Sequence, residues 1–86
     1  MSALDEIAAA IDAVREKIDE ALNASQEVDQ SIDEASSTAT ALGASATVEG
    51  LAGLSSEIQT LIQQLGTAGE TAKDALATAQ GIAENT

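Results

Sequence analysis

The sequence has no cysteine, no histidine and no aromatic residue, and each absence excludes a class of protein. Without cysteine there are no disulfides, and without cysteine and histidine there are none of the usual zinc sites. A core must therefore be built from small aliphatic side chains, with 19 alanines and only 18 leucines, isoleucines and valines. Such a core is thin for 86 residues. The usual remedy that remains is association with another chain.

Basic residues are scarce as well, with three against 15 acids and a net charge of −12. A surface this acidic repels nucleic acid and anionic membranes, so neither is expected as a partner. The longest apolar run is the five-residue IAAAI at 7–11, so we expect no membrane insertion. The N-terminal stretch carries acids where a cleavable signal peptide carries positive charge. We therefore expect a protein that is cytoplasmic, or that is exported without a cleavable signal peptide.

Proline is absent too, and the abundance of alanine, glutamate, glutamine and leucine favours helix throughout. From Leu4 to Leu42, apolar residues recur at alternating steps of three and four, interrupted only by Ser25. The same alternation runs from Leu51 to Ile82. This spacing is the a/d pattern of coiled coils and helical bundles. The large side chains expected in a core or interface are Leu4, Ile7, Ile11, Val14, Ile18, Leu22, Val28, Ile32, Leu42, Val48, Leu51, Leu54, Ile58, Leu61, Ile62, Leu65, Leu76 and Ile82.

The segment between these two patterns contains the features of a turn. Gly43 follows the last residue of the first pattern, where a left-handed glycine commonly ends a helix. Ser45 or Thr47 is then expected to cap the next helix, as Ser2 with Asp5 is expected to cap the first. We predict a single all-α domain, an antiparallel two-helix hairpin with helices at about 3–42 and 47–83 and a turn at 43–46. The rival is one continuous helix, against which the glycine and the capping residues argue.

The second predicted helix has two unusual features. A break is conceivable at 66–69, where Thr67 and Glu70 have capping-box spacing, but the unbroken apolar pattern favours a continuous helix with a weak point. Five glycines lie within this half, and each costs about 1 kcal/mol in a helix interior relative to alanine. Two interpretations stay open, close packing against another helix and compositional drift. The stretch 66–79 is nearly all alanine on its apolar side, so it is expected to be the less stable part.

Acidic residues form a stripe along the first helix, opposite the apolar pattern. A solvated outer face is the plain interpretation, and docking to a basic partner, in the extreme as a DNA mimic, is the functional one. The second helix has five acids and more serine, threonine and glutamine, which makes it the expected contact face. The stripe comprises Asp5, Glu6, Asp12, Asp19, Glu20, Glu27, Asp33 and Glu34.

Catalysis has few groups to use, because only carboxylates and two lysines remain as acid–base residues. A two-helix rod also offers no concave pocket that could alter their pKa values. The run from Asp29 to Asp33 imitates the start of a calcium loop, but glycine at its sixth position and glutamate at its twelfth are missing. We expect no enzyme activity, no metal and no cofactor.

The length, the central turn and the two amphipathic helices resemble the Trp-x-Gly helical hairpins exported by type VII secretion in Gram-positive bacteria. The Trp-x-Gly tripeptide corresponds to Ala41-Leu42-Gly43, which keeps the glycine and has alanine in place of tryptophan. The export signal, tyrosine with an acid four residues later, corresponds to Gln80 and Glu84, which keeps the acid alone. The resemblance implies a homodimer or heterodimer that forms a four-helix bundle, and the alanine-rich composition is similar to that of actinobacterial proteins.

Three functional hypotheses follow from these observations. The first is a non-enzymatic, acidic helical-hairpin interaction protein that acts as a homodimer or with another helical protein, with a possible relation to type VII secretion. The second is an acidic decoy that inhibits a nucleic-acid-binding protein. The third is a structural coiled-coil scaffold with open-ended assembly.

Overall fold

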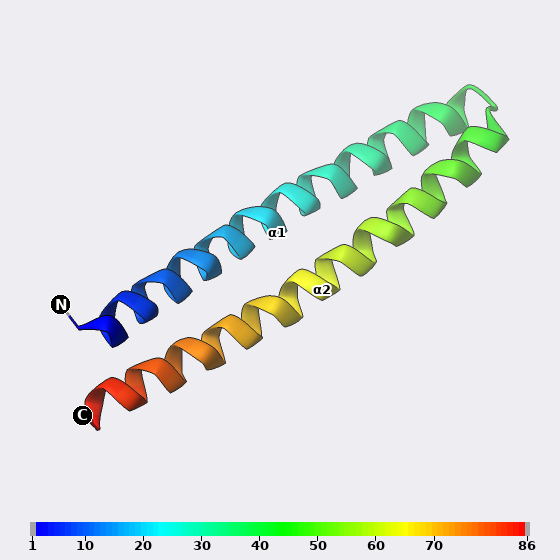
Figure 1. Ribbon diagram of the computed structural model, residues 1–86. Helices are drawn as coiled ribbons and strands as arrows, with labels where there is room; N and C mark the ends of the chain where they lie inside the picture. Colours follow the sequence, from blue (N-terminus) through cyan, green and yellow to red (C-terminus); the bar gives the residue numbers. More distant parts are fainter. Residues whose placement is uncertain (1, 86) are drawn as a thin grey trace.

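A computed structural model describes residues 2–85 as two long helices that run side by side in opposite directions (Figure 1). Helix α1 spans Ala3–Ala41 and helix α2 spans Ser45–Glu84. The molecule is a rod of 65 × 16 × 11 Å, with both termini at one end and the turn at the other. The chain is therefore an all-α helical hairpin and not one continuous helix. Compared with the expected bounds, α1 ends one residue earlier, and α2 begins two residues earlier and ends one later.

The start of α1 is held by a reciprocal cap. The backbone N–H of Asp5 donates to the Ser2 hydroxyl over 3.2 Å, and the Ser2 N–H donates to the Asp5 carboxylate over 3.4 Å. This confirms the expected capping pair, with aspartate in the place usually taken by glutamate. The two bonds satisfy backbone donors that the first turn of a helix leaves without a partner.

The turn is built around Gly43, the one residue among 2–85 with a positive φ, at 70°. The N–H of Gly43 donates to the carbonyl of Thr40, and the N–H of Ala44 donates to the carbonyl of Ala39 over 2.9 Å. These two bonds form a Schellman motif, the arrangement that ends a helix with a left-handed glycine. The prediction that Gly43 ends the first helix is confirmed.

The expectation that Ser45 or Thr47 caps the second helix is wrong. The N-cap of α2 is Ala44, and no side chain accepts a hydrogen bond there. The Schellman motif orders the backbone as far as Ala44, so α2 begins immediately afterwards and the N–H of Val48 already donates to the Ala44 carbonyl. Ser45 and Thr47 therefore lie inside the first turn of α2 rather than before it.

Helix α2 continues without a break through 66–69, as expected. The Thr67 hydroxyl donates to the carbonyl of Gln63 over 3.1 Å, within the helix, and does not act as a cap. Gly69 lies where α2 meets α1, and a Cβ added there would be 3.6 Å from Cγ2 of Ile18, which is ordinary contact. The other glycines inside α2 have open space around them in the hairpin.

Two columns of side chains on each helix form the seam between α1 and α2. The central column lies on the predicted a/d pattern and contains every side chain that is buried among residues 2–85. The flanking column beside it is half-buried. The central column comprises Leu4, Ile11, Ile18, Ser25, Ile32 and Ala39 of α1, with Leu51, Ile58, Leu65, Ala72 and Ala79 of α2. The flanking column comprises Ala8, Arg15, Leu22, Asp29 and Ser36 of α1, with Val48, Ser55, Ile62, Gly69, Leu76 and Ala83 of α2.

The remaining positions of the a/d pattern lie outside this seam, which differs from a simple a/d pairing of the two helices. Seven side chains that were expected in a core or interface are between 41% and 78% exposed in the hairpin. The reason is that apolar residues lie on both sides of the central column, so the pattern permits either side to face the neighbouring helix. The seven exposed side chains are Ile7, Val14, Val28, Leu42, Leu54, Leu61 and Ile82.

Candidate functional site

The seven exposed aliphatic side chains lie in one column on each helix, next to the central column of the seam. They recur every seven residues, so each column follows a single stripe of its helix. Alanine occupies the positions between them. We call this surface the apolar face, and it comprises Ile7, Val14, Ala21, Val28 and Ala35 of α1 with Leu42 directly after it, and Leu54, Leu61, Ala68, Ala75 and Ile82 of α2.

Both columns lie on the same side of the rod, so they form one continuous surface. Val14 of α1 lines a hollow of about 560 Å³ together with Ala68 and Ala75 of α2. A second hollow of about 340 Å³ is lined by Val14 and Ala21 of α1 and by Leu65 of α2. Each hollow combines members of the apolar face with members of the central column, so the central column is also reached from this side.

The sizes of the side chains on the two helices differ from level to level along this face. Near the open end, Val14 of α1 lies beside Ala68 and Ala75 of α2. The bond between Asp29 and Ser55 fixes the level of the two helices nearer the turn. At that level Leu54 of α2 lies beside Val28 of α1, and both side chains are exposed. Large side chains of the two helices are therefore adjacent near the turn, whereas Val14 has only alanines of α2 beside it.

The apolar face is nearly free of charge, although the protein is strongly acidic. The next row outward on α1 contains only one charged residue, Lys17, whose Nζ lies 3.3 Å from Oε2 of Glu20. The next row outward on α2 also contains only one, Glu57. The remaining 14 acids lie elsewhere on the rod, because the heptad places them on its other surfaces.

The opposite side of the rod, the polar face, receives much of this charge. On α1 it carries Asp5, Asp12, Glu16, Asp19 and Asp33. The Asp12 carboxylate lies 2.8 Å from Nη2 of Arg15 in an exposed ion pair. The stripe expected along the first helix is therefore divided, because its aspartates lie on the polar face and its glutamates on the outer edge of α1. These outer-edge glutamates are Glu6, Glu20, Glu27 and Glu34.

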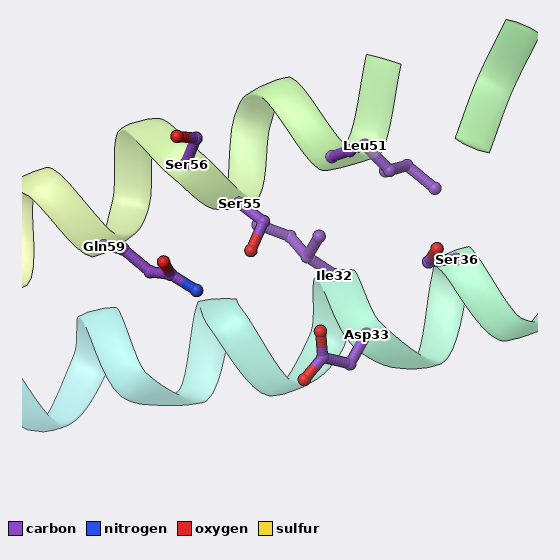
Figure 2. Close-up of a pocket in the computed structure, with 8 residues that line it drawn as sticks. Ile32, Asp33, Ser36, Leu51, Ser55, Ser56 and Gln59 are labelled. Atoms are coloured by element: carbon purple, nitrogen blue, oxygen red, sulfur yellow. The ribbon is translucent and has the colours of Figure 1, made fainter. Parts of the chain in front are cut away.

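The polar face contains a hollow of about 400 Å³ between the two helices (Figure 2). Asp33 and Ser36 of α1 line it, together with Ser55 and Gln59 of α2, and Ile32 reaches from α1 toward α2. Close by, the Ser55 hydroxyl donates to the Asp29 carboxylate over 3.0 Å, in the one side-chain hydrogen bond that joins the two helices within residues 2–85. These groups hold the helices in register.

Chemically active groups do not come together on either face. Across residues 2–85 there is no group of three or more carboxylates, histidines or cysteines placed to hold a metal ion. The buried Ser25 hydroxyl donates to the carbonyl of Ala21 over 2.8 Å, so its hydrogen bond stays within α1. Of the expected turn residues, Gly43 and Ser45 line a shallow hollow at the turn, and Thr47 lies exposed in α2.

Comparison with known proteins finds no match to a family model, to a curated protein or to a solved structure. In the part of the chain that the structure describes, neither helix has a stretch with the length and hydropathy needed to cross a bilayer. The functional argument therefore depends on the geometry of the two faces alone.

Proposed function

We propose that this chain is a non-enzymatic helical-hairpin interaction protein that binds a second helical chain through its apolar face. The second chain is either another copy or a different protein. One observation carries the proposal. All seven large aliphatic side chains that are exposed among residues 2–85 lie on one face of the rod. A continuous apolar surface along the whole length of a soluble rod is typical of an interaction site.

The choice of side chains in the hairpin supports this proposal. The flanking column of the seam contains four large aliphatics besides Arg15, Asp29 and Ser55, whereas the apolar face contains seven large aliphatics. Burial of aliphatic surface stabilises a fold by about 25 cal/mol per Å², so the hairpin alone leaves its better column unused. A second chain on the apolar face would use it.

The geometry that results is that of a four-helix bundle. A core-facing helix of such a bundle has apolar residues in a stripe three positions wide in every seven. In each helix here, the central column would face the middle of the bundle, the flanking column the other helix of the hairpin, and the apolar face the second chain.

The proposal is tested by placing carboxylates on the apolar face. The double variant Val14→Asp with Leu61→Asp puts two charges where the second chain would pack. The matched control is Ala9→Asp with Ala77→Asp, which adds the same charge at exposed positions of the polar face. Unpaired buried charges cost several kcal/mol, so we expect the first variant to weaken association by about 100-fold or more.

Association is measured by sedimentation equilibrium and light scattering, with circular dichroism as the check on helix content. The control variant is expected to associate like the unmodified chain. An unmodified chain that stays a stable, highly helical monomer at low micromolar concentration would contradict the proposal. Equal loss of association in both double variants would also contradict it, because added charge and not its position would then be the cause.

The acidic decoy is a rival that uses the polar face and the outer edge of α1. It predicts that replacing Asp12, Asp19 and Asp33 by lysine abolishes binding to a nucleic-acid-binding protein, while the change of Val14 and Leu61 does not. This rival leaves the apolar face unexplained. The open-ended scaffold needs apolar surface on more than one side of the rod, and the exposed aliphatic side chains lie on one side.

A relation to type VII secretion is a subordinate part of the proposal and rests on architecture. The hairpin, with Gly43 at the turn and Glu84 at the end of α2, is the arrangement that the resemblance implies. Its test is export of the chain by a bacterium that has the machinery, compared with a Glu84→Gln variant. Export that requires Glu84 supports the relation, and a chain that stays inside the cell contradicts it.

A further inference from the structure

We infer that the chain on the apolar face is a second copy of this protein, arranged so that the two turns lie side by side. In this arrangement α1 of each copy packs on α2 of the other. The inference rests on the proposed function, since it identifies the occupant of the surface proposed there. Two features of the hairpin carry it: the area of the face and the distribution of acids between the helices.

The area of the face suits a pair of identical rods. The hairpin is 65 Å long and 16 Å wide, so contact along its length covers about 1,000 Å² on each copy, compared with about 800 Å² per partner in a standard interface. A second copy has the same length and brings a face with the same low charge. A symmetric contact of this kind closes on itself and leaves no apolar face exposed.

Two symmetric arrangements bring the two apolar faces together. If the two-fold axis runs along the rods, the turns lie side by side and α1 lies on α2 of the second copy. If the axis runs across the rods, the turns lie at opposite ends and α1 lies on α1 of the second copy. The neighbouring helices are antiparallel in both arrangements, so helix dipoles do not distinguish them.

The distribution of acids distinguishes them. Helix α1 contains ten acids, with Arg15 and Lys17 as its only bases, whereas α2 contains five acids and Lys73. When α1 lies on α1, the outer-edge glutamates of both copies run next to one another, and like charges in contact are unfavourable. When α1 lies on α2, the same glutamates run beside an edge with a single acid. That edge comprises Gly53, Thr60, Thr67, Asp74 and Gly81.

The hollow beside Val14 is compatible with this arrangement without any sliding of the rods. An axis along the rods keeps every residue of the second copy at its own level. Val14 of one copy then lies opposite Ala68 and Ala75 of the other, because these residues share one level in the hairpin. Near the turn, Leu54 of one copy lies at the level of Val28 of the other, because the adjacent residues Ser55 and Asp29 are hydrogen-bonded in the hairpin. Large side chains therefore meet small ones around Val14, and large aliphatic side chains of both copies meet at the level of Val28 and Leu54.

The absence of cysteine allows a direct distance measurement. A single cysteine is introduced as Ala41→Cys at the turn end of α1, or as Asn23→Cys in the middle of α1, both exposed positions away from the apolar face. Each variant of the full chain is labelled with a nitroxide, and distances between copies are measured by pulsed electron resonance. With packed helices about 10 Å apart, the Ala41→Cys labels are expected within about 30 Å of each other when the turns lie side by side. They are expected about 55 Å apart when the turns lie at opposite ends.

The Asn23→Cys labels separate failure of the arrangement from failure of association. This position lies near the middle of the rod, so its labels come close in both symmetric arrangements. Short distances for both variants support the inference. A short distance for Asn23→Cys with a long one for Ala41→Cys overturns it and leaves the proposed function standing. The absence of any coupling, with the mass of a monomer in light scattering, overturns self-association; binding of a different helical chain through Val14 and Leu61 would then preserve the proposed function.

Discussion

The seam between α1 and α2 is the more buried surface of the hairpin, and the apolar face beside it is exposed. The polar and aliphatic side chains are not divided between them as burial would suggest. The seam includes Arg15, Asp29 and Ser55 in its flanking column, while Ile7 and Leu61 face solvent on the apolar face. The central column contains all the buried side chains and serves both surfaces. The comparison teaches that each helix has apolar positions for two neighbours, of which the hairpin supplies one.

A second lesson concerns how little the seam buries. The buried side chains among residues 2–85 are one isoleucine, three alanines and a serine, namely Ile32, Ala39, Ala72, Ala79 and Ser25. Small side chains permit close approach of the helices but remove little apolar area from water. Most large side chains of the seam are therefore only half-buried in the hairpin, and cover on the apolar face would bury seven more.

The largest effect is expected when the same charge is placed on the seam and on the apolar face in turn. Ile32 is 6% exposed in the seam, so Ile32→Asp buries an unpaired carboxylate and is expected to destabilise the hairpin by several kcal/mol. Val28 is 44% exposed one turn away on the apolar face, so Val28→Asp is expected to cost less. Urea unfolding followed by circular dichroism measures both. A greater loss for Val28→Asp would mean that the apolar face, and not the seam, is the main core.

A smaller effect is expected when one leucine of the seam and one leucine of the apolar face are each truncated to alanine. Leu76→Ala removes a half-buried side chain of the flanking column, which faces the other helix of the hairpin, and is expected to cost about 2 kcal/mol at every protein concentration. Leu61→Ala removes one from the apolar face, so its effect on the melting temperature is expected to grow as the protein concentration rises. Thermal unfolding across a hundredfold range of concentration checks this difference. Identical concentration dependence for the two variants would contradict a role of Leu61 in association.

The turn joins the two helices whose surfaces are compared, so its glycine is the next position to test. Gly43→Ala places a Cβ at a φ of 70° and is expected to cost about 1–2 kcal/mol, without a change in helix content at low temperature. Chemical unfolding measures the loss. Gly43→Asn serves as the control, because asparagine tolerates this backbone conformation better and is expected to cost less. Equal losses in both variants would contradict the assignment of the cost to the left-handed backbone.

The smallest expected effect concerns the outer edge of α2. A Cβ at Gly53 meets nothing within 4 Å in the hairpin, so Gly53→Ala is expected to stabilise the isolated hairpin by about 1 kcal/mol through helix propensity. Unfolding at low protein concentration measures this gain, and association at high concentration shows whether a second chain lies against the edge. A loss of stability at low concentration would contradict the open surroundings of Gly53.

Much of the fold could be predicted from the sequence, because local chemistry decides it. Gly43 predicts the end of α1, and Ser2 with Asp5 predicts its start. The cap of α2 could not be predicted in this way, because the Schellman hydrogen bonds of Ala44 replace a side-chain cap and depend on how α1 ends.

The candidate site was only partly predictable. The spacing of Val14 and Leu61 identifies them as core or interface residues, and the heptad shows that the rows beside them contain only Lys17 and Glu57 as charged residues. The exposure of these two side chains could not be predicted from the sequence, because the a/d pattern is compatible with a neighbouring helix on either side of the central column.

The sequence by itself determined two long helices, a turn at Gly43 and a net charge of −12, because helix propensity, left-handed glycine and charge count are local properties. Only the tertiary structure decided which side of each helix meets the other. Rotation of a helix by one column exchanges a flanking column for an apolar face at no cost in backbone hydrogen bonds. That choice depends on how Ile18 meets Gly69 and how Asp29 meets Ser55 across the seam, which are contacts between residues far apart in the chain.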